Sequence, residues 1–141
     1  MSELRLTTSR RINAPVEAVF NAWLDAEMLA RFMLPGEGMS VPSAEADARE
    51  GGRFSIVMQA GEQQIPHAGE FKVINKHSQI VFTWESPFSI DGSTVTLNFT
   101  SSGGGTDLEL IHVKFPDAQS RDNHLGGWGN ILAALDNVLS N

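Results

Sequence analysis

The chain has 141 residues, no cysteine and a formal net charge of −7 at pH 7. The lack of cysteine excludes disulfides, zinc–thiolate sites and thiol nucleophiles, and it fits a reducing compartment such as the cytoplasm. The acidic balance would repel a phosphate backbone, and the only tight basic pair is Arg10-Arg11, so we expect no nucleic-acid partner.

Apolar residues make up 41% of the chain and charged residues 19%, which is typical of a globular protein. No stretch approaches the ~18 apolar residues of a membrane span, and the first residues lack the pattern of a secretory signal. The sequence contains no internal repeat and no low-complexity linker. We therefore expect a single cytoplasmic domain over residues 1–141.

The N-terminal third predicts one strand and two short helices. Residues 4–12 alternate roughly and indicate a strand. Asn13 is a favourable N-cap for a helix in which Pro15 occupies the first turn. Apolar residues then recur at helical spacing at Val16, Val19, Phe20, Trp23 and Leu24. Asp25 can cap a second short helix that ends at Leu34-Pro35.

The middle of the chain predicts strands separated by turns. Residues 53–60 alternate clearly, residues 61–64 indicate a turn, and glycines 103–105 indicate a hairpin loop. In the segment from 67 to 75 the alternation places His67, Phe71 and Val73 on one inward face. The predicted strands are 41–49, 53–60, 67–75, 80–84, 94–100 and 108–112.

The tail from Asp117 to Leu139 is the longest predicted helix, because its apolar residues form a single stripe. Gly126-Gly127-Trp128-Gly129 interrupts this pattern, since each glycine inside a helix costs about 1 kcal/mol relative to alanine. Two interpretations are open. The helix begins only at Trp128, or it is continuous and approaches the sheet closely at a point where a ligand enters.

This order of elements predicts an α+β fold. Short turns between consecutive strands favour a curved antiparallel sheet of about seven strands, and only the C-terminal helix is long enough to cover its apolar face. A curved sheet cannot follow a straight helix along its whole length, so we expect a cavity between them, although large side chains could equally fill the space. The candidate ligand-binding residues are Trp23, Phe32, Phe54, Ile56, Met58, His67, Phe71, Phe82, Trp84, Leu97, Phe99, Leu110, His112, Trp128 and Leu132.

Several motifs together resemble the family of activator of heat-shock protein 90 ATPase homologues, in the START-like (SRPBCC, helix-grip) superfamily. The motifs are the segment 12–25 around Ala14-Pro15-Val16, the pair Gly51-Gly52 before Arg53-Phe54, the segment Gly69-Glu70-Phe71 followed by 80–84, and Gly127-Trp128 with Leu132 and Leu135. The resemblance implies a helix-grip fold with a pocket between sheet and long helix, and it implies no fixed reaction. The family often has a tryptophan pair where this chain has Phe32-Met33.

The four histidines form no metal-binding motif, and we expect no metal site, cofactor or catalytic residue. His67 and His112 lie on inward faces, where they could orient a polar ligand group or act as acid and base. The interpretation that we favour is that each is a hydrogen-bonded histidine of the core. We expect His77 to be solvated in a turn and His124 to stack on Trp128, one helical turn away.

Three functions fit these observations. The first is binding of a small hydrophobic or amphipathic ligand without catalysis, with His67, His112 or Trp84 orienting it. The second, suggested by the family name, is an interaction domain that contacts a chaperone or a similar partner, and a homodimer is a further possibility. The third is a cyclase or hydratase type of enzyme, of the kind found among START-like relatives, which would use a pocket histidine.

Overall fold

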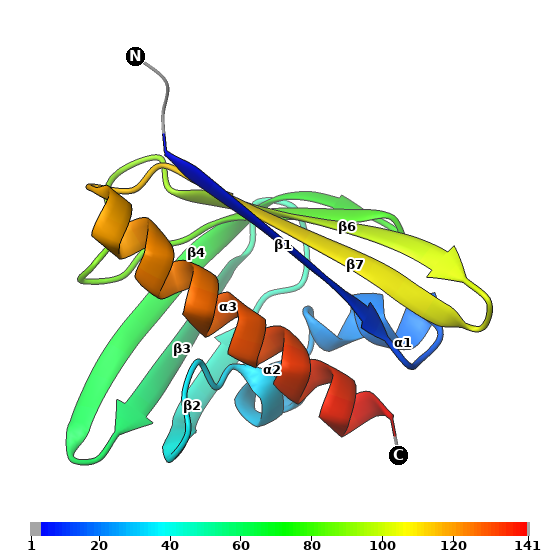
Figure 1. Cartoon of the computed structure of the whole chain (residues 1–141), viewed down its shortest axis with the longest axis horizontal. Helices are drawn as coiled ribbons and strands as arrows, with labels where there is room; N and C mark the ends of the chain where they lie inside the picture. Colours follow the sequence, from blue (N-terminus) through cyan, green and yellow to red (C-terminus); the bar gives the residue numbers. More distant parts are fainter. Residues whose placement is uncertain (1–3, 141) are drawn as a thin grey trace.

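A computed structural model describes residues 4–140 (Figure 1). These residues form a seven-stranded antiparallel sheet in the order β1-β7-β6-β5-β4-β3-β2, with two short helices after β1 and one long helix at the end. The elements are β1 (Arg5–Ile12), α1 (Val16–Ala22), α2 (Ala26–Phe32), β2 (Met39–Ala46), β3 (Arg53–Ala60), β4 (Gln63–Asn75), β5 (Gln79–Thr83), β6 (Thr94–Ser102), β7 (Gly105–Val113) and α3 (Ala118–Leu139). The predicted α+β, helix-grip architecture is confirmed.

The sheet curls around α3, which crosses its concave side diagonally (Figure 1). Asp117 begins α3 by accepting a hydrogen bond from the Ser120 N–H, and Asp136 near its end accepts from the Arg10 side chain on β1. The first contact caps the start of the helix, and the second joins its C-terminal end to β1. Within the described residues, no helix is long and apolar enough to cross a membrane.

The two short helices close one end of the molecule. Asp25 caps α2 as predicted, since its Oδ1 accepts the Glu27 N–H at 2.9 Å. Helix α1 is present as predicted, but the predicted N-cap was wrong, because the N-cap is Pro15 and Asn13 instead donates its main-chain N–H to Asp136 on α3. The link between residues 13 and 136 joins the start of the helical segment to the C-terminal helix.

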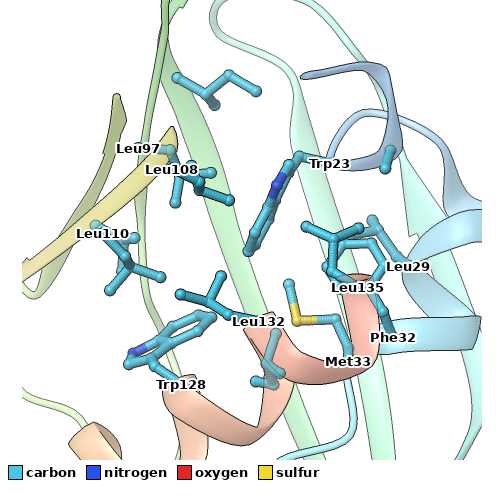
Figure 2. Close-up of a cluster of buried hydrophobic side chains, with 14 of the residues drawn as sticks. Trp23, Leu29, Phe32, Met33, Leu97, Leu108, Leu110, Trp128, Leu132 and Leu135 are labelled. Atoms are coloured by element: carbon cyan, nitrogen blue, oxygen red, sulfur yellow. The ribbon is translucent and has the colours of Figure 1, made fainter. Parts of the chain in front are cut away.

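Side chains from these helices fill the space beneath the C-terminal half of α3 (Figure 2). Trp23 packs edge-on against Phe32, with ring centroids 4.9 Å apart, and lies 6.5 Å from the Trp128 ring. Leu132 and Leu135 of α3 belong to the same buried cluster as Leu97 of β6 and Leu108 and Leu110 of β7 (Figure 2). The interior at this end is therefore a close-packed core.

Strand β4 differs from its prediction in two ways. It begins at Gln63, so the turn contains only Gly61 and Glu62. A register shift between Phe71 and Val73 then moves Val73 to the outer face, opposite Val81, and turns Ile74 inward against Ile80. A bulge of this kind reverses the alternation that the sequence pattern assumes, and it bends the strand.

Helix α3 is continuous through its glycines, so the interpretation that it begins at Trp128 was wrong. A Cβ atom at Gly126 or Gly129 would meet no heavy atom within 4 Å, whereas one at Gly127 would lie 3.2 Å from Pro35 Cβ. The close approach at this point is thus between α3 and the segment that follows α2, and it does not involve the sheet.

These surroundings predict different effects for three substitutions on α3. Gly126→Ala and Gly129→Ala should each raise the free energy of unfolding by about 1 kcal/mol, because alanine is the better helix former and has free space there. Gly127→Ala should gain less, because its methyl group presses on Pro35. Denaturant titration of the three variants measures this, and equal gains at all three positions would contradict the packing described.

Candidate ligand-binding site

A pocket of about 660 Å³ lies beside the N-terminal half of α3. This volume is within the range of about 300–1,000 Å³ that is typical of small-molecule sites. One wall comes from β3 and β4, another from α3, and a third from the loop between β5 and β6. The lining residues are Pro35, Met39, Met58, Ile65, His67, Trp84, Pro87, Phe88, Ser89, Ile90, Pro116, Asp117, Gln119, Ser120, Asn123, His124, Gly127, Trp128 and Ile131.

Four of the predicted ligand-binding residues line this pocket: Met58, His67, Trp84 and Trp128. The other predicted residues are buried in the core and do not line it. The two possibilities left open by the sequence therefore occur at opposite ends of α3. The core is filled where α1 and α2 reach under the helix, and a pocket remains where they do not. The buried set is Trp23, Phe32, Phe54, Ile56, Phe71, Phe82, Leu97, Phe99, Leu110, His112 and Leu132.

Sequence reasoning missed Phe88 and Ile90, in the loop between β5 and β6 (residues 84–93). The loop is closed by the Trp84 N–H, which donates to the Ser93 carbonyl at 2.9 Å. Phe88 and Ile90 within it line the pocket, yet they are 56% and 43% exposed. The available signal was two large apolar residues inside a segment with turn composition, where no strand or helix pattern requires them.

His67 lies on the β4 wall of the pocket. Its Nδ1 is 3.1 Å from the Ile65 carbonyl oxygen, which can only accept, so Nδ1 carries the proton. Burial lowers the pKa of His67 to about 4. At neutral pH the ring is therefore uncharged, and its Nε2 keeps a lone pair available as a hydrogen-bond acceptor.

His112 is fully buried in the core, between the sheet and α3. The Trp128 indole N–H donates to its Nδ1 at 3.0 Å, and its Nε2 lies 2.6 Å from Ser93 Oγ. An indole nitrogen can only donate, so the His112 proton is on Nε2 and is donated to Ser93. Both ring nitrogens are thus used in joining α3, β7 and the loop that borders the pocket.

The same arrangement decides what His112 and Ser93 can do chemically. A histidine that activates a serine must accept the hydroxyl proton, whereas Nε2 of His112 is the donor here. Ser93 is also buried and does not line the pocket. The hydrogen bond between His112 and Ser93 therefore has a structural role, in agreement with the interpretation that we favoured for His112.

His124 lies on the α3 wall of the pocket and donates from Nδ1 to the Ser120 carbonyl at 2.8 Å. Its ring lies edge-on to His112, at 5.2 Å between centroids, and also 5.2 Å from Phe115. Within residues 4–140 the His124 ring pairs with these two rings and not with Trp128, so the stacking predicted from the sequence was wrong. Trp128 instead turns its indole toward His112. His77, expected to be solvated, is half-buried and packs edge-on against Phe20.

The Trp128–His112 hydrogen bond generates a matched pair of variants. Trp128→Phe would leave Nδ1 of His112 buried without a donor, which costs about 1–3 kcal/mol beyond the loss of ring volume. The Trp84 Nε1 has no hydrogen-bond partner within the described residues, so Trp84→Phe reduces the ring volume without breaking a hydrogen bond. We expect Trp128→Phe to be the more destabilising of the two in denaturant titration, and the reverse order would contradict this reading of the network.

Burial of His112 also predicts acid sensitivity. Its pKa is lowered from 6.5 to about 3 by burial, so below pH 6.5 the unfolded chain binds a proton that the folded chain does not. The free energy of unfolding should therefore fall as the pH drops from 6.5 toward 3, by about 2 kcal/mol at pH 5 from this residue. Denaturant titration at pH 7 and pH 5, with NMR titration of the His112 ring, measures this. Equal stability at the two pH values would contradict it.

Comparison with solved structures identifies similar folds over nearly the whole chain. A protein from Chromobacterium violaceum has a TM-score of 0.86 at 26% identity and covers 97% of each chain. The AHSA1 protein from Silicibacter pomeroyi has a TM-score of 0.82 at 27% identity, covering 97% of this chain and 98% of that one. An AHSA1-like protein from Aeromonas hydrophila has a TM-score of 0.79 at 24% identity, covering 95% and 90%.

Among curated proteins, none matches the sequence significantly. Residues 13–140, however, match the family described as Activator of Hsp90 ATPase homolog 1-like protein. This match spans most of the chain and confirms the resemblance seen in the sequence motifs. The START-like fold of that family supports a ligand-binding or interaction domain in general. The chain therefore belongs to the Activator of Hsp90 ATPase homolog 1-like protein family.

Proposed function

We propose that this protein binds a small, mainly apolar molecule in the pocket beside the N-terminal half of α3. The observation that carries the proposal is the pocket itself, which has the volume of a small-molecule site and walls from three separate elements. Two large aromatic rings, Trp84 and Trp128, form its inner end, 4.8 Å apart between centroids. A flat apolar ligand part can pack on them.

The exposed side chains at the mouth support the same function. Phe88 and Ile90 are two of the three large hydrophobic residues that are exposed within the described part of the chain. Covering apolar surface contributes roughly 25 cal/mol for each Å² removed from water. A ligand seated against Trp84 and Trp128 would remove part of the Phe88 and Ile90 surface from water, and this gain favours binding at the mouth.

The polar groups of the pocket suit orientation of a ligand better than covalent chemistry. Asp117 is the one carboxylate in the lining, so the lining does not offer the paired carboxylates that acid–base catalysis commonly uses. His112, the acid–base candidate from the sequence, is held outside the pocket by Trp128 and Ser93. We therefore propose binding, without a reaction, as the role of the site.

A protein partner is the other role that the family name suggests. We place small-molecule binding first because the large aromatic residues and the exposed loop residues line one concave site. The exposed Phe88 and Ile90 lie at the mouth of that site and do not form a separate flat patch. A chaperone or a second copy of the chain would have to contact other surfaces or cover the pocket.

A blocking substitution tests the proposed function. Asn123 is exposed on the α3 wall of the pocket, so Asn123→Trp should fill the mouth and weaken binding of apolar ligands at least tenfold. Leu125→Trp is the matched control, because Leu125 is exposed on the same helix but does not line the pocket. Binding of a library of apolar compounds is followed by thermal shift and tryptophan fluorescence.

Compounds that raise the melting temperature of the original protein and of Leu125→Trp, but not of Asn123→Trp, are the expected result. If no compound in a broad apolar library shifts the melting temperature, or if Asn123→Trp binds as well as the control, the pocket is not the binding site and the proposal fails.

A further inference from the structure

The pocket has one charged side chain, and that charge is negative. With histidine counted as neutral, Asp117 is the only charged residue among the described residues that line the pocket, which include neither lysine nor arginine. The chain as a whole has a net charge of −7. An anionic ligand would therefore meet repulsion without an ion-pair partner, whereas a cation would be attracted both by Asp117 and by the protein as a whole.

The Asp117 carboxylate is able to pair with a ligand. Its Oδ1 accepts the Ser120 N–H at 2.8 Å, and within residues 4–140 the group forms no salt bridge. Arg121 pairs with Asp122 at 3.1 Å, and neither Arg121 nor Lys114 lines the pocket. Because Asp117 is exposed, its second oxygen remains free to accept from a cation.

His67 offers a ligand a hydrogen-bond acceptor and no donor. Its Nδ1 donates to the Ile65 carbonyl, and burial lowers its pKa to about 4, so Nε2 keeps a lone pair at neutral pH. Within the described residues, the buried side-chain nitrogen and oxygen atoms without a hydrogen-bond partner are the indole nitrogens of Trp23 and Trp84. His67 Nε2 has no partner but is not among these atoms, so it is accessible. This wall therefore favours a ligand group that donates.

An ammonium group matches these surroundings better than a hydroxyl or a carboxylate group. All three of its hydrogen-bonding positions are donors, and it alone gains from the charge of Asp117. It also gains from Phe88, which is exposed at the mouth, because the face of an aromatic ring attracts cations. A hydroxyl group can donate to His67 but carries no charge, and a carboxylate can only accept.

Building on the proposed function, we propose that the ligand is an apolar amine, whose ammonium group pairs with Asp117 while its apolar body lies in the pocket. The carboxylate that begins α3 then has two roles. Its Oδ1 caps the helix through the Ser120 N–H, and its negative charge selects the ligand.

Three probes that share a naphthalene ring test this: 2-naphthylmethylamine, which is charged at pH 7.5, 2-naphthylmethanol and 2-naphthoate. Affinity for the full chain is measured by calorimetry at low and at physiological ionic strength. Asp117→Asn removes the charge and keeps a favourable N-cap. Asp122→Asn is the matched control, because Asp122 is exposed on the same helix but does not line the pocket.

At low ionic strength the amine should bind at least about fivefold more tightly than the alcohol, and more than about tenfold more tightly than the carboxylate. Asp117→Asn should weaken amine binding about fivefold and leave alcohol binding unchanged, while Asp122→Asn should change either by less than about twofold. Added salt should weaken binding of the amine but not of the alcohol. Any variant that fails to fold is excluded by its NMR spectrum, and the order of the three probes on the unchanged protein still decides.

Three results would overturn the inference and leave the proposed function standing. The first is that the alcohol or the carboxylate binds as tightly as the amine. The second is that Asp117→Asn and Asp122→Asn weaken amine binding equally, since the preference would then come from the overall charge. The third is that other compounds of the apolar library bind and none of them is an amine. If no probe and no library compound binds, the proposed function itself fails and the inference falls with it.

Discussion

The hydrogen bond from Trp128 to His112 is the contact on which the rest of the structure depends. Trp128 is on α3, at the boundary between the filled core and the pocket, and His112 is on β7. Because Nδ1 of His112 accepts from Trp128, its Nε2 must donate to Ser93, at the end of the loop that borders the pocket. Three elements are thereby fixed around one buried, uncharged imidazole ring.

The two short helices explain why one end of the curved sheet is closed and the other is open. Beneath the C-terminal half of α3, Trp23 and Phe32 pack against each other and against the helix (Figure 2). Beneath the N-terminal half, Trp128 is held toward His112, and no residue of α1 lines the space that remains. The pocket is therefore a consequence of where the two short helices end.

Much of the fold could be predicted from the sequence. Alternation in β3 and the apolar stripe of α3 identify these elements, because each has one apolar face over many residues. The errors occurred where a local feature breaks the period, as at the bulge after Phe71 and in the glycines around Trp128. Tertiary packing determines the local backbone conformation at such positions, and the periodicity of a single sequence does not contain that information.

The candidate site was harder to predict than the fold. The alternation of the strands places both Leu97 and Trp84 on inward faces, but only Trp84 lies where the interior is unfilled. Phe88 and Ile90 belong to a loop, and no period indicates which way a loop side chain points. Asp117 was visible as the start of a helix, whereas its place at the pocket follows from how α3 crosses the sheet.

The pocket beside the N-terminal half of α3 is open in the free protein, and Trp84 and Trp128 are among its lining residues. A crystal structure of the protein grown with a compound that raises its melting temperature would show where that compound lies. We expect electron density for the apolar part of the compound against Trp84 and Trp128, beside the loop from Trp84 to Ser93. A structure in which side chains fill this space, or in which the compound binds elsewhere, would contradict the proposed function.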